Sequence, residues 1–286
     1  MASLRSVTIV GVGLIGGSIG LGVRARGLAA KVVGYGSRPA TLEAALKLGA
    51  VDEVAADPAA AVAEAELVVV CAPVDHIAKR VQQLAPLCQP GTLLTDAGST
   101  KAQIVRELEA AAAGWNPDVR FVGSHPLAGN EKRGPQHASA DLFAGRVVVV
   151  TPTTQTRPDD RRKLETFWSE LGARVVEMPP EEHDAALAVT SHLPHLVAAA
   201  LAGSTPEEFV QLTAGGWQDS TRIAAGDPSL WRQILLANRD NLLAALARFA
   251  DLAAEYRQAL EGSDAAQLEH LLAEAKRIRD ACDARL

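Results

Sequence analysis

Short apolar runs alternate with alanine-rich segments along residues 1–178 of the chain. Several of these runs are apolar at nearly every position, which is typical of parallel strands that are covered by helices on both faces. We therefore predict an α/β domain over residues 1–178, with a doubly wound and mostly parallel sheet. The expected strands are the runs VTIVGVG, KVVGYG, ELVVVCAP, GTLLTDAG, VRFVGSH, GRVVVVTP and ARVVEMP.

The pattern changes after Pro179 and Pro180, where the strand-like runs end. Residues 230–260 and 265–286 instead have apolar positions at helical spacing, and the second segment carries charges on its outer face. We therefore predict an all-helical domain over residues 179–286. Helices so rich in alanine and leucine often pack against a second copy, so we expect this domain to form a homodimer.

One stretch of the helical domain, Ala185 to Pro206, is uncharged and long enough to cross a bilayer. It contains His192, Pro194 and His195, so we expect a buried helix and no membrane association. The two histidines are three residues apart and share a helix face, as metal ligands can. No third ligand is apparent at a suitable spacing, so we expect no metal and interpret His192 as a packed or hydrogen-bonded core residue.

The composition is that of a soluble globular protein, with 48% hydrophobic residues, 22% charged residues and a net charge of −6. Lysine and arginine are scattered among acidic residues, so no nucleic-acid partner is expected and a small molecule is favoured. The three cysteines have no paired or zinc-like spacing, which favours the reducing cytoplasm. The first apolar run contains six glycines and no small-residue cleavage site, so it does not resemble a signal peptide.

The first expected strand leads into the sequence GVGLIG, which contains Gly11, Gly13, Leu14, Ile15 and Gly16. In a turn of this kind the first glycine permits the tight turn, the second lets the backbone approach a pyrophosphate, and the third permits close helix packing. The N-terminus of the helix that follows attracts the anion. We therefore predict that these five residues bind a dinucleotide cofactor.

The next expected strand ends at Gly36, where a carboxylate for the ribose hydroxyls of NAD is usual in such folds. The hydroxyl of Ser37 and the guanidinium of Arg38 follow directly, and both suit a 2′-phosphate. We therefore expect NADP as the cofactor. The alternative that Arg38 is a solvated surface residue and that NAD binds through other contacts stays open. Ala72 and Pro73 follow a further strand at the same sheet edge and are also expected at the cofactor.

Two polar segments, DAGSTK with Ser99 and GSHPLAGN with His125, end the next two expected strands. The carboxyl ends of strands are where open α/β sheets bind ligands, so both side chains are candidates for the reacting site. A histidine in a turn can also be a purely structural group. Further polar residues occur in SHLPH at 191–195 and in GGWQDSTRIAAGDPSLW at 215–231.

The order of GxGxxG, DxGSxK, GSHPLAG, SHLPH and DSTRIAxxDPxxW resembles the prephenate and arogenate dehydrogenases of tyrosine biosynthesis, and it extends over nearly the whole chain. The resemblance implies a Rossmann-like N-terminal domain and a helical C-terminal dimerisation domain. It also implies oxidative decarboxylation of a cyclohexadienol carboxylate, with hydride transfer to a nicotinamide.

The resemblance also implies roles for individual residues. The histidine of the HP motif, here His125, assists removal of the ring hydroxyl proton, and the serine of DxGSxK, here Ser99, lies near that hydroxyl and the nicotinamide. Arg222 matches the arginine that binds a substrate carboxylate, and His195 matches a histidine that lines the pocket. A neutral imidazole suits proton removal near pH 7, and a planar guanidinium suits bidentate binding of a carboxylate.

Each assignment has an alternative. Arg222 could instead form a structural ion pair with Asp219 or Asp227. Trp231 is either a core residue or a wall of the substrate pocket. Asn130 follows the HP motif closely and either contacts the substrate or belongs to a solvated loop.

The leading hypothesis is an NADP-dependent prephenate dehydrogenase. Arogenate is the alternative substrate, and dual use is a third possibility; His195 favours prephenate because a histidine suits a keto acid better than an ammonium group. The β-hydroxyacid dehydrogenases combine similar domains, but they use a lysine of the helical domain, and none occurs between Lys163 and Lys276. A non-catalytic NADP-binding sensor is the hypothesis from another class.

Overall fold

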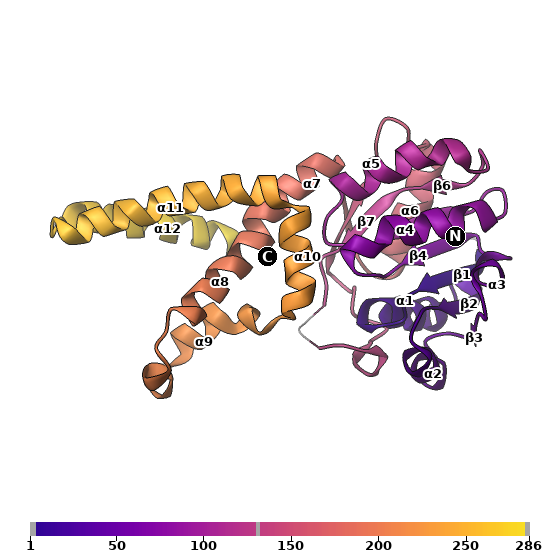
Figure 1. The fold of residues 1–286 in the computed structure, drawn as a ribbon, viewed down its shortest axis with the longest axis horizontal. Helices are drawn as coiled ribbons and strands as arrows, with labels where there is room; N and C mark the ends of the chain where they lie inside the picture. The colour runs from indigo at the N-terminus through magenta and orange to yellow at the C-terminus, as the bar shows by residue number, and fades with distance from the viewer. Residues whose placement is uncertain (1–3, 130–131, 284–286) are drawn as a thin grey trace. The chain divides into compact units, whose positions relative to one another are not determined.

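The computed structural model of the chain describes residues 4–129 and 132–283 (Figure 1). Contacts divide the chain into two compact units, Met1–Asn238 and Arg239–Leu286. The first unit contains both the sheets and the beginning of the helical region. The domain boundary expected at residue 178 lies within this unit and stays a prediction.

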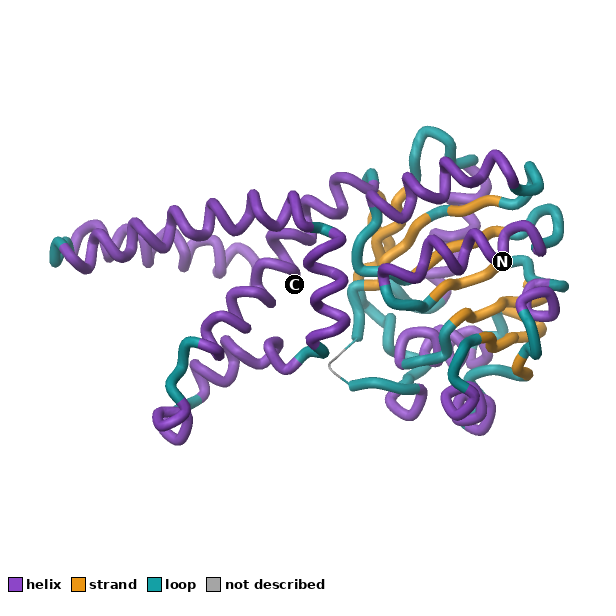
Figure 2. The backbone as a smooth tube through the Cα atoms, in the orientation of Figure 1, coloured by secondary structure: helices purple, strands orange, loops and turns teal. Residues whose placement is uncertain are grey.

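The main sheet has six parallel strands, and its strand order reverses beside the first strand. Figure 2 shows the strands of the chain in orange among the helices. In spatial order the strands are β3 (Glu53–Val54), β2 (Ala29–Tyr35), β1 (Leu4–Val10), β4 (Leu67–Val70), β5 (Leu93–Asp96) and β6 (Arg120–Phe121). This is the Rossmann-like, doubly wound topology that the strand pattern predicts. Its ligand crevice is expected where the order reverses, beyond the carboxyl ends of β1 and β4.

Helices cover both faces of this sheet, and each face has its own apolar core. One core joins the sheet to α1 (Leu14–Ala25), α2 (Pro39–Lys47) and α6 (Pro158–Glu170), and the other joins it to α3 (Pro58–Val62), α4 (Val74–Leu84) and α5 (Ala102–Ala111). Alternate residues of β4 enter opposite cores: Leu67 and Val69 face the first, and Val68 and Val70 face the second. The run at β4 is therefore continuously apolar because both faces of the strand are covered by helices, as the sequence indicated.

A second sheet contains β7 (Gly123–Pro126), β8 (Val147–Thr151) and β9 (Arg174–Glu177), with β7 antiparallel to β8 and β8 parallel to β9. The prediction that VRFVGSH forms one strand was wrong. The run divides at Val122, whose N–H still bonds the carbonyl of Leu94 in the main sheet at 3.0 Å. After that residue the chain pairs with β8 instead.

The helical region begins with α7 (Pro180–Leu187), a π turn (Ala188–His192) and α8 (Leu193–Gly203), and continues with α9 (Gly215–Thr221) and α10 (Pro228–Ala237). Arg239–Leu286 contains α11 (Arg239–Glu261) and α12 (Ala265–Asp283), which pack against each other. Short 3-10 turns occur at Ala85–Leu87, Ala112–Gly114, Pro135–His137, Glu207–Leu212 and Arg222–Ala225. The helical pattern expected over residues 230–260 is interrupted at Asn238, whose φ of −112° and ψ of 28° are not helical.

Among the described residues, Pro180–Gly203 is long and apolar enough to span a membrane. The expectation of a buried helix was only partly correct, because 28% of its apolar window is buried and Val189 and Leu201 are exposed. The same stretch carries His183, Asp184 and His192, which are buried and hydrogen-bonded within the first unit. These contacts fit a helix of the folded domain.

The packing of α1 on β1 provides a test of the fold. A Cβ added at Gly16 would lie 2.1 Å from the carbonyl oxygen of Gly11 and 2.9 Å from Cγ2 of Ile9, whereas one added at Gly13 meets nothing within 4 Å. We expect Gly16→Ala to lower the free energy of unfolding by roughly 1–3 kcal/mol, and the control Gly13→Ala to change it by less than about 1 kcal/mol. Urea unfolding measures both; a Gly16→Ala protein as stable as the wild type would contradict the close packing.

Candidate active site

The turn between β1 and α1 has the geometry of an anion-binding site. Gly11 has a φ of 97°, and a Cβ added there would lie 2.4 Å from the carbonyl oxygen of Cys71. Gly13 precedes the first residue of α1 and has open space around it, and no side chain of the described residues caps this helix. The first N–H groups of α1 are therefore free to bind a phosphate, with Leu14 and Ile15 directly at the helix start.

The end of β2 lies beside this turn, because the N–H of Gly11 bonds the carbonyl oxygen of Tyr35 at 2.8 Å. Gly36 follows Tyr35, and a Cβ added there would approach no atom closer than 3.8 Å. Packing therefore does not require glycine at this position. Ser37 and Arg38 follow and are exposed to solvent.

On the other side of β1, Ala72 and Pro73 follow β4 and precede α4. Ala72 is half-buried and Pro73 is exposed. The residues expected at the cofactor thus follow the carboxyl ends of β1, β2 and β4, which are neighbours in the sheet.

His125 lies in β7 and is 8% exposed. The preceding residue, Ser124, ties this strand to the carboxyl end of β5: its N–H donates to Oδ1 of Asp96 at 3.2 Å, and its hydroxyl donates to the carbonyl of Asp96 at 2.6 Å. The structure therefore brings His125 beside the end of β5, but within a strand of the second sheet and not at the end of a strand of the parallel sheet, where the sequence analysis expected it.

Asp96 also organises the turn that carries Ser99. Its Oδ2 accepts the N–H of Gly98 at 2.9 Å and contacts the ammonium of Lys101, and both charged side chains are fully buried. Burial lowers the pKa of Lys101, and the charge of Asp96 opposes that effect. Ser99 lies half-buried between these anchored residues.

A chain of buried side chains extends from His125 to the start of α5. Nδ1 of His125 lies 2.8 Å from Nε2 of His183, and Nδ1 of His183 lies 2.8 Å from Oδ1 of Asp184. The carboxylate of Asp184 also accepts the N–H groups of Lys101 and Ala102, at 2.7 and 2.9 Å. The sequence analysis missed His183 and Asp184; an adjacent His-Asp pair directly after the Pro-Pro boundary was the available signal.

His192 and His195 lie further along the same helical stretch and have different surroundings. The amide nitrogen of Asn238 donates to the carbonyl of Asp184 at 2.7 Å and lies 3.0 Å from Nδ1 of His192. His192 is 1% exposed, which confirms its interpretation as a hydrogen-bonded core residue. The ring of His195 stacks on Trp231, with centroids 3.5 Å apart and an interplanar angle of 11°.

His195 and Trp231 line one wall of a largely apolar cavity of about 420 Å³. Its other lining residues include Ala224, Pro228 and Leu235. Trp231 is half-buried, so the structure favours the pocket-wall alternative over a core position.

Arg222 begins the 3-10 turn after α9 and is exposed to solvent. Arg222 does not form the alternative ion pair with Asp227. The carboxylate of Asp227 instead contacts Arg133 and accepts the N–H of Leu230 at 2.7 Å. Within residues 4–129 and 132–283, the guanidinium of Arg222 has no carboxylate partner. Asn130, the other predicted substrate contact, lies outside the described residues.

Burial lowers the pKa of all four clustered histidines. It holds the pKa of His125 well below the ordinary 6.5, and the neighbouring His183 and Lys101 reinforce the effect. Burial also lowers the pKa of His183 and His195, and that of His192 to about 4. All four rings are therefore uncharged near pH 7, and His125 can accept a proton.

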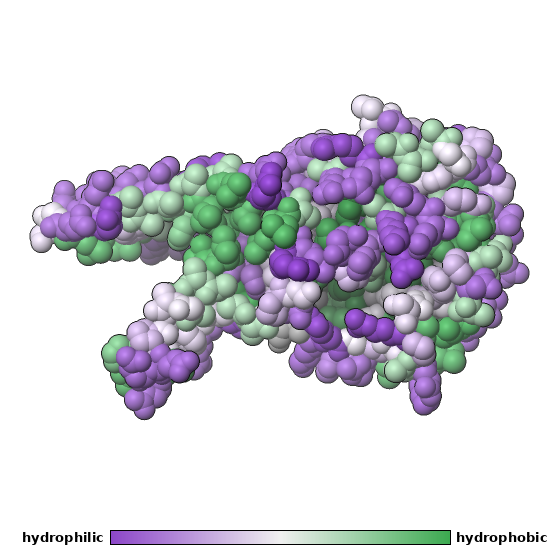
Figure 3. Space-filling view, viewed as in Figure 1, coloured by the Kyte–Doolittle hydropathy of each residue, from purple (hydrophilic) through white to green (hydrophobic). Residues whose placement is uncertain are grey.

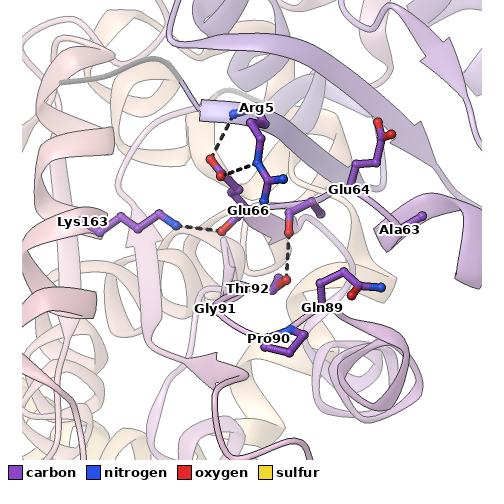
Figure 4. A pocket seen from close by; sticks show the side chains of 10 residues that line it. Arg5, Ala63, Glu64, Glu66, Gln89, Pro90, Gly91, Thr92 and Lys163 are labelled. Atoms are coloured by element: carbon purple, nitrogen blue, oxygen red, sulfur yellow. Dashed lines mark hydrogen bonds and ion pairs between the residues drawn. The ribbon is translucent and has the colours of Figure 1, made fainter.

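A second cavity, of about 370 Å³, lies at the opposite edge of the main sheet, where β1, β4 and β5 begin (Figure 4). Its charged groups have partners in the chain: Nε of Arg5 lies 2.7 Å from Oε1 of Glu66, and Lys163 donates to the backbone carbonyl of Glu66 at 2.9 Å. This cavity is remote from the carboxyl ends of the strands and is not part of the candidate site.

Family models match both halves of the chain. The model of the prephenate dehydrogenase nucleotide-binding domain matches residues 19–177, and that of the prephenate dehydrogenase dimerization domain matches residues 179–274. The prephenate dehydrogenase of Bacillus subtilis is 34% identical, over 96% of this chain and 75% of its own length. The cyclohexadienyl dehydrogenase of Zymomonas mobilis is 32% identical, over 98% of this chain and 96% of its own length.

Solved structures give the same result. Prephenate dehydrogenase of Aquifex aeolicus, in complex with hydroxyphenyl propionate and NAD+, superposes with a TM-score of 0.90 at 33% identity, covering 98% of this chain and 99% of that one. Arogenate dehydrogenase of Synechocystis superposes with a TM-score of 0.81 at 28% identity, covering 97% and 99%. A 3-hydroxyisobutyrate dehydrogenase of Mycobacterium tuberculosis, at 15% identity and a TM-score of 0.62 over 94% and 99%, shares the fold alone.

The lowered pKa of His192 predicts how stability depends on pH. Between its ordinary value of 6.5 and its folded value of about 4, the unfolded chain holds a proton that the folded protein excludes. Stability is therefore complete above pH 6.5 and falls as the pH drops toward 4, by roughly 3 kcal/mol from this residue.

Urea unfolding of the wild type and of His192→Asn, at about pH 7.5 and about pH 5, measures this effect. Asparagine keeps an oxygen near the position of Nδ1 and cannot take up a proton, so the variant should lose less stability on acidification. An equal loss in both proteins would show that His192 is not responsible.

Proposed function

Because the chain belongs to the prephenate dehydrogenase family, we propose that this dehydrogenase converts prephenate to 4-hydroxyphenylpyruvate with NADP as the hydride acceptor. The observation that carries the proposal is the position of His125: a buried, uncharged histidine at the carboxyl end of β5, in the domain whose first turn has the geometry for a dinucleotide. The reaction requires those two features together.

The proposed role of His125 is that of a general base. The imidazole takes the proton of the ring hydroxyl while the carbon that bears the hydroxyl loses a hydride. The bond between the ring and its carboxylate then breaks, carbon dioxide leaves, and the electron pair of that bond makes the ring aromatic. The phenolate oxygen that results takes the proton back from His125, which regenerates the uncharged imidazole. General-base assistance of this kind contributes roughly 10²- to 10⁴-fold to a rate.

The nicotinamide cofactor, when bound, supplies the hydride acceptor. Its pyrophosphate is proposed to lie on the turn from Gly11 to Gly16, with Ala72 and Pro73 along the cofactor. Ser99 is proposed to hydrogen-bond near the substrate hydroxyl and the nicotinamide. The free N–H groups at the start of α1 support the first of these assignments.

The proposed substrate contacts come from the helical region. The exposed guanidinium of Arg222 is available to a carboxylate of prephenate, and His195 with Trp231 is proposed to line the substrate pocket. Asn130 is proposed as a further contact. Arogenate dehydrogenase and cyclohexadienyl dehydrogenase are among the relatives. Rates with arogenate must therefore be measured beside those with prephenate.

We also propose a cytoplasmic homodimer that forms through the helical domain. The dimerization-domain match supports this, and so do the exposed apolar side chains of α11 and α12, which include Leu243, Leu260, Leu272 and Ile278. Figure 3 shows apolar residues gathered on the surface of the helices. Such faces are typical of surfaces covered by a second copy.

The first test compares substrates. Initial rates of NADPH formation with prephenate and with arogenate, at matched concentrations, should be clearly higher with prephenate. His125→Asn should reduce kcat by roughly 10²-fold or more while leaving the dissociation constant for NADP nearly unchanged. A higher rate with arogenate would overturn the substrate, and a His125→Asn protein with wild-type turnover would overturn the base.

The second test concerns the cofactor. Gly36→Asp places a carboxylate where the packing leaves room for it, so it should repel the 2′-phosphate of NADP without disturbing the fold. We expect the ratio of kcat/KM for NADP to that for NAD to fall by roughly 10-fold or more, since loss of one charged contact costs about 1.5–3 kcal/mol. Arg38→Gln should lower the same ratio, and Arg161→Gln, on the exposed part of α6, is the control. A wild-type enzyme that prefers NAD would overturn the assignment of NADP.

A further inference from the structure

We propose that Asp184 and His183 are positioning residues that hold His125 as the tautomer protonated at Nδ1, which leaves Nε2 as its proton-accepting nitrogen. The proposal rests on the proposed function only in assigning the role of base to His125; the tautomer itself follows from the contacts of the three residues.

Both carboxylate oxygens of Asp184 accept backbone N–H groups, those of Lys101 and Ala102. A carboxylate carries no hydrogen, so both oxygens can only accept hydrogen bonds. Nδ1 of His183, at 2.8 Å from Oδ1, must therefore carry a hydrogen and donate it. The contacts of Asp184 with the start of α5 thus determine that the hydrogen between Asp184 and His183 belongs to Nδ1 of His183.

His183 is uncharged, because it is fully buried and burial lowers its pKa. A neutral imidazole with a hydrogen on Nδ1 has a lone pair on Nε2. That lone pair lies 2.8 Å from Nδ1 of His125, so the hydrogen between the two rings belongs to His125. With Nδ1 protonated and the ring uncharged, the lone pair of His125 is on Nε2.

The same chain stabilises the charge that forms during turnover. When Nε2 takes up the hydroxyl proton, His125 becomes a cation in a buried site that also contains Lys101. His183 can pass part of that charge toward Asp184 through its two hydrogen bonds, because its Nε2 accepts from the cation and its Nδ1 donates to the carboxylate. A third group that orients the base is the general logic of such relays, on whatever fold they occur.

A structural alternative exists for the same contacts. His183 and Asp184 could serve only to hold α7 against β7 and α5, in which case any well-packed side chain at 183 would support turnover. The two readings differ in the protonation of His125 and in the response of kcat to variants of equal stability.

The first experiment measures the tautomer directly. The full-length protein is labelled with ¹⁵N-histidine, and long-range ¹H–¹⁵N correlations identify the protonated nitrogen of each ring near pH 7.5 in the absence of substrate. His125→Asn assigns the signal of His125 among the seven histidines. A protonated Nδ1 supports the proposal and a protonated Nε2 overturns it. This result does not depend on which substrate the enzyme uses, so it is separate from the failure of the proposed function.

The second experiment compares His183→Gln with His183→Leu. Glutamine can place its amide oxygen near the position of Nε2 and accept from His125, whereas leucine has no acceptor. We expect His183→Leu to lower kcat by roughly 100-fold and His183→Gln to stay within about 10-fold of the wild type, with KM and the dissociation constant for NADP changed by less than about 3-fold. His76→Leu, on the exposed surface of α4, is the matched control.

Thermal unfolding of each variant separates positioning from folding. Equal kcat for the leucine and glutamine variants would overturn the positioning role. So would a decrease in kcat that is fully explained by the decrease in the unfolding temperature of the same variant. In His183→Leu the ¹⁵N signals of His125 should also shift toward the tautomer protonated at Nε2, and unchanged signals would overturn the proposal.

Discussion

Asp184 joins the start of α5, the ring of His183 and the end of α10. Its carboxylate accepts the N–H of Lys101 and contacts His183, and its backbone carbonyl accepts from the amide of Asn238. Each of these groups is buried, so removing the carboxylate would leave several unsatisfied donors where water cannot replace it. The positions of His125 and of the beginning of the helical region therefore depend on one residue that is not expected to contact the substrate.

The main features of the fold could be predicted because they are local. The glycines at 11, 13 and 16, the apolar strands and the change of pattern after Pro180 each reflect a constraint within a few residues of sequence. The candidacy of His125 was predictable for the same reason, since the HP motif follows an apolar run, although the sheet to which it belongs was not. The match to the family then rests on the order of such motifs along the chain.

Other features could not be predicted because they depend on tertiary partners. Nothing in VRFVGSH indicates that pairing changes from the main sheet to β8 at Val122, since the apolar pattern continues through it. Asp184 resembles any acidic residue in the first turns of a helix, and its partner Lys101 is 83 residues away. The break at Asn238 is likewise due to a buried amide that bonds two groups from earlier helices.

The π turn at Ala188–His192 changes which face of the helical stretch each of the following residues occupies. In a regular helix, nine residues at about 100° each would place His183 and His192 on opposite faces. A π turn contains more residues per turn, as if one residue had been inserted, and it therefore rotates His192 toward the side that His183 occupies. Deleting one residue of this turn would restore an ordinary helix and rotate His195 away from Trp231. The spacing of these histidines in the sequence therefore predicts their relative orientation only when the π turn is taken into account. A helical wheel drawn with 3.6 residues per turn places His192 on the wrong face relative to His183.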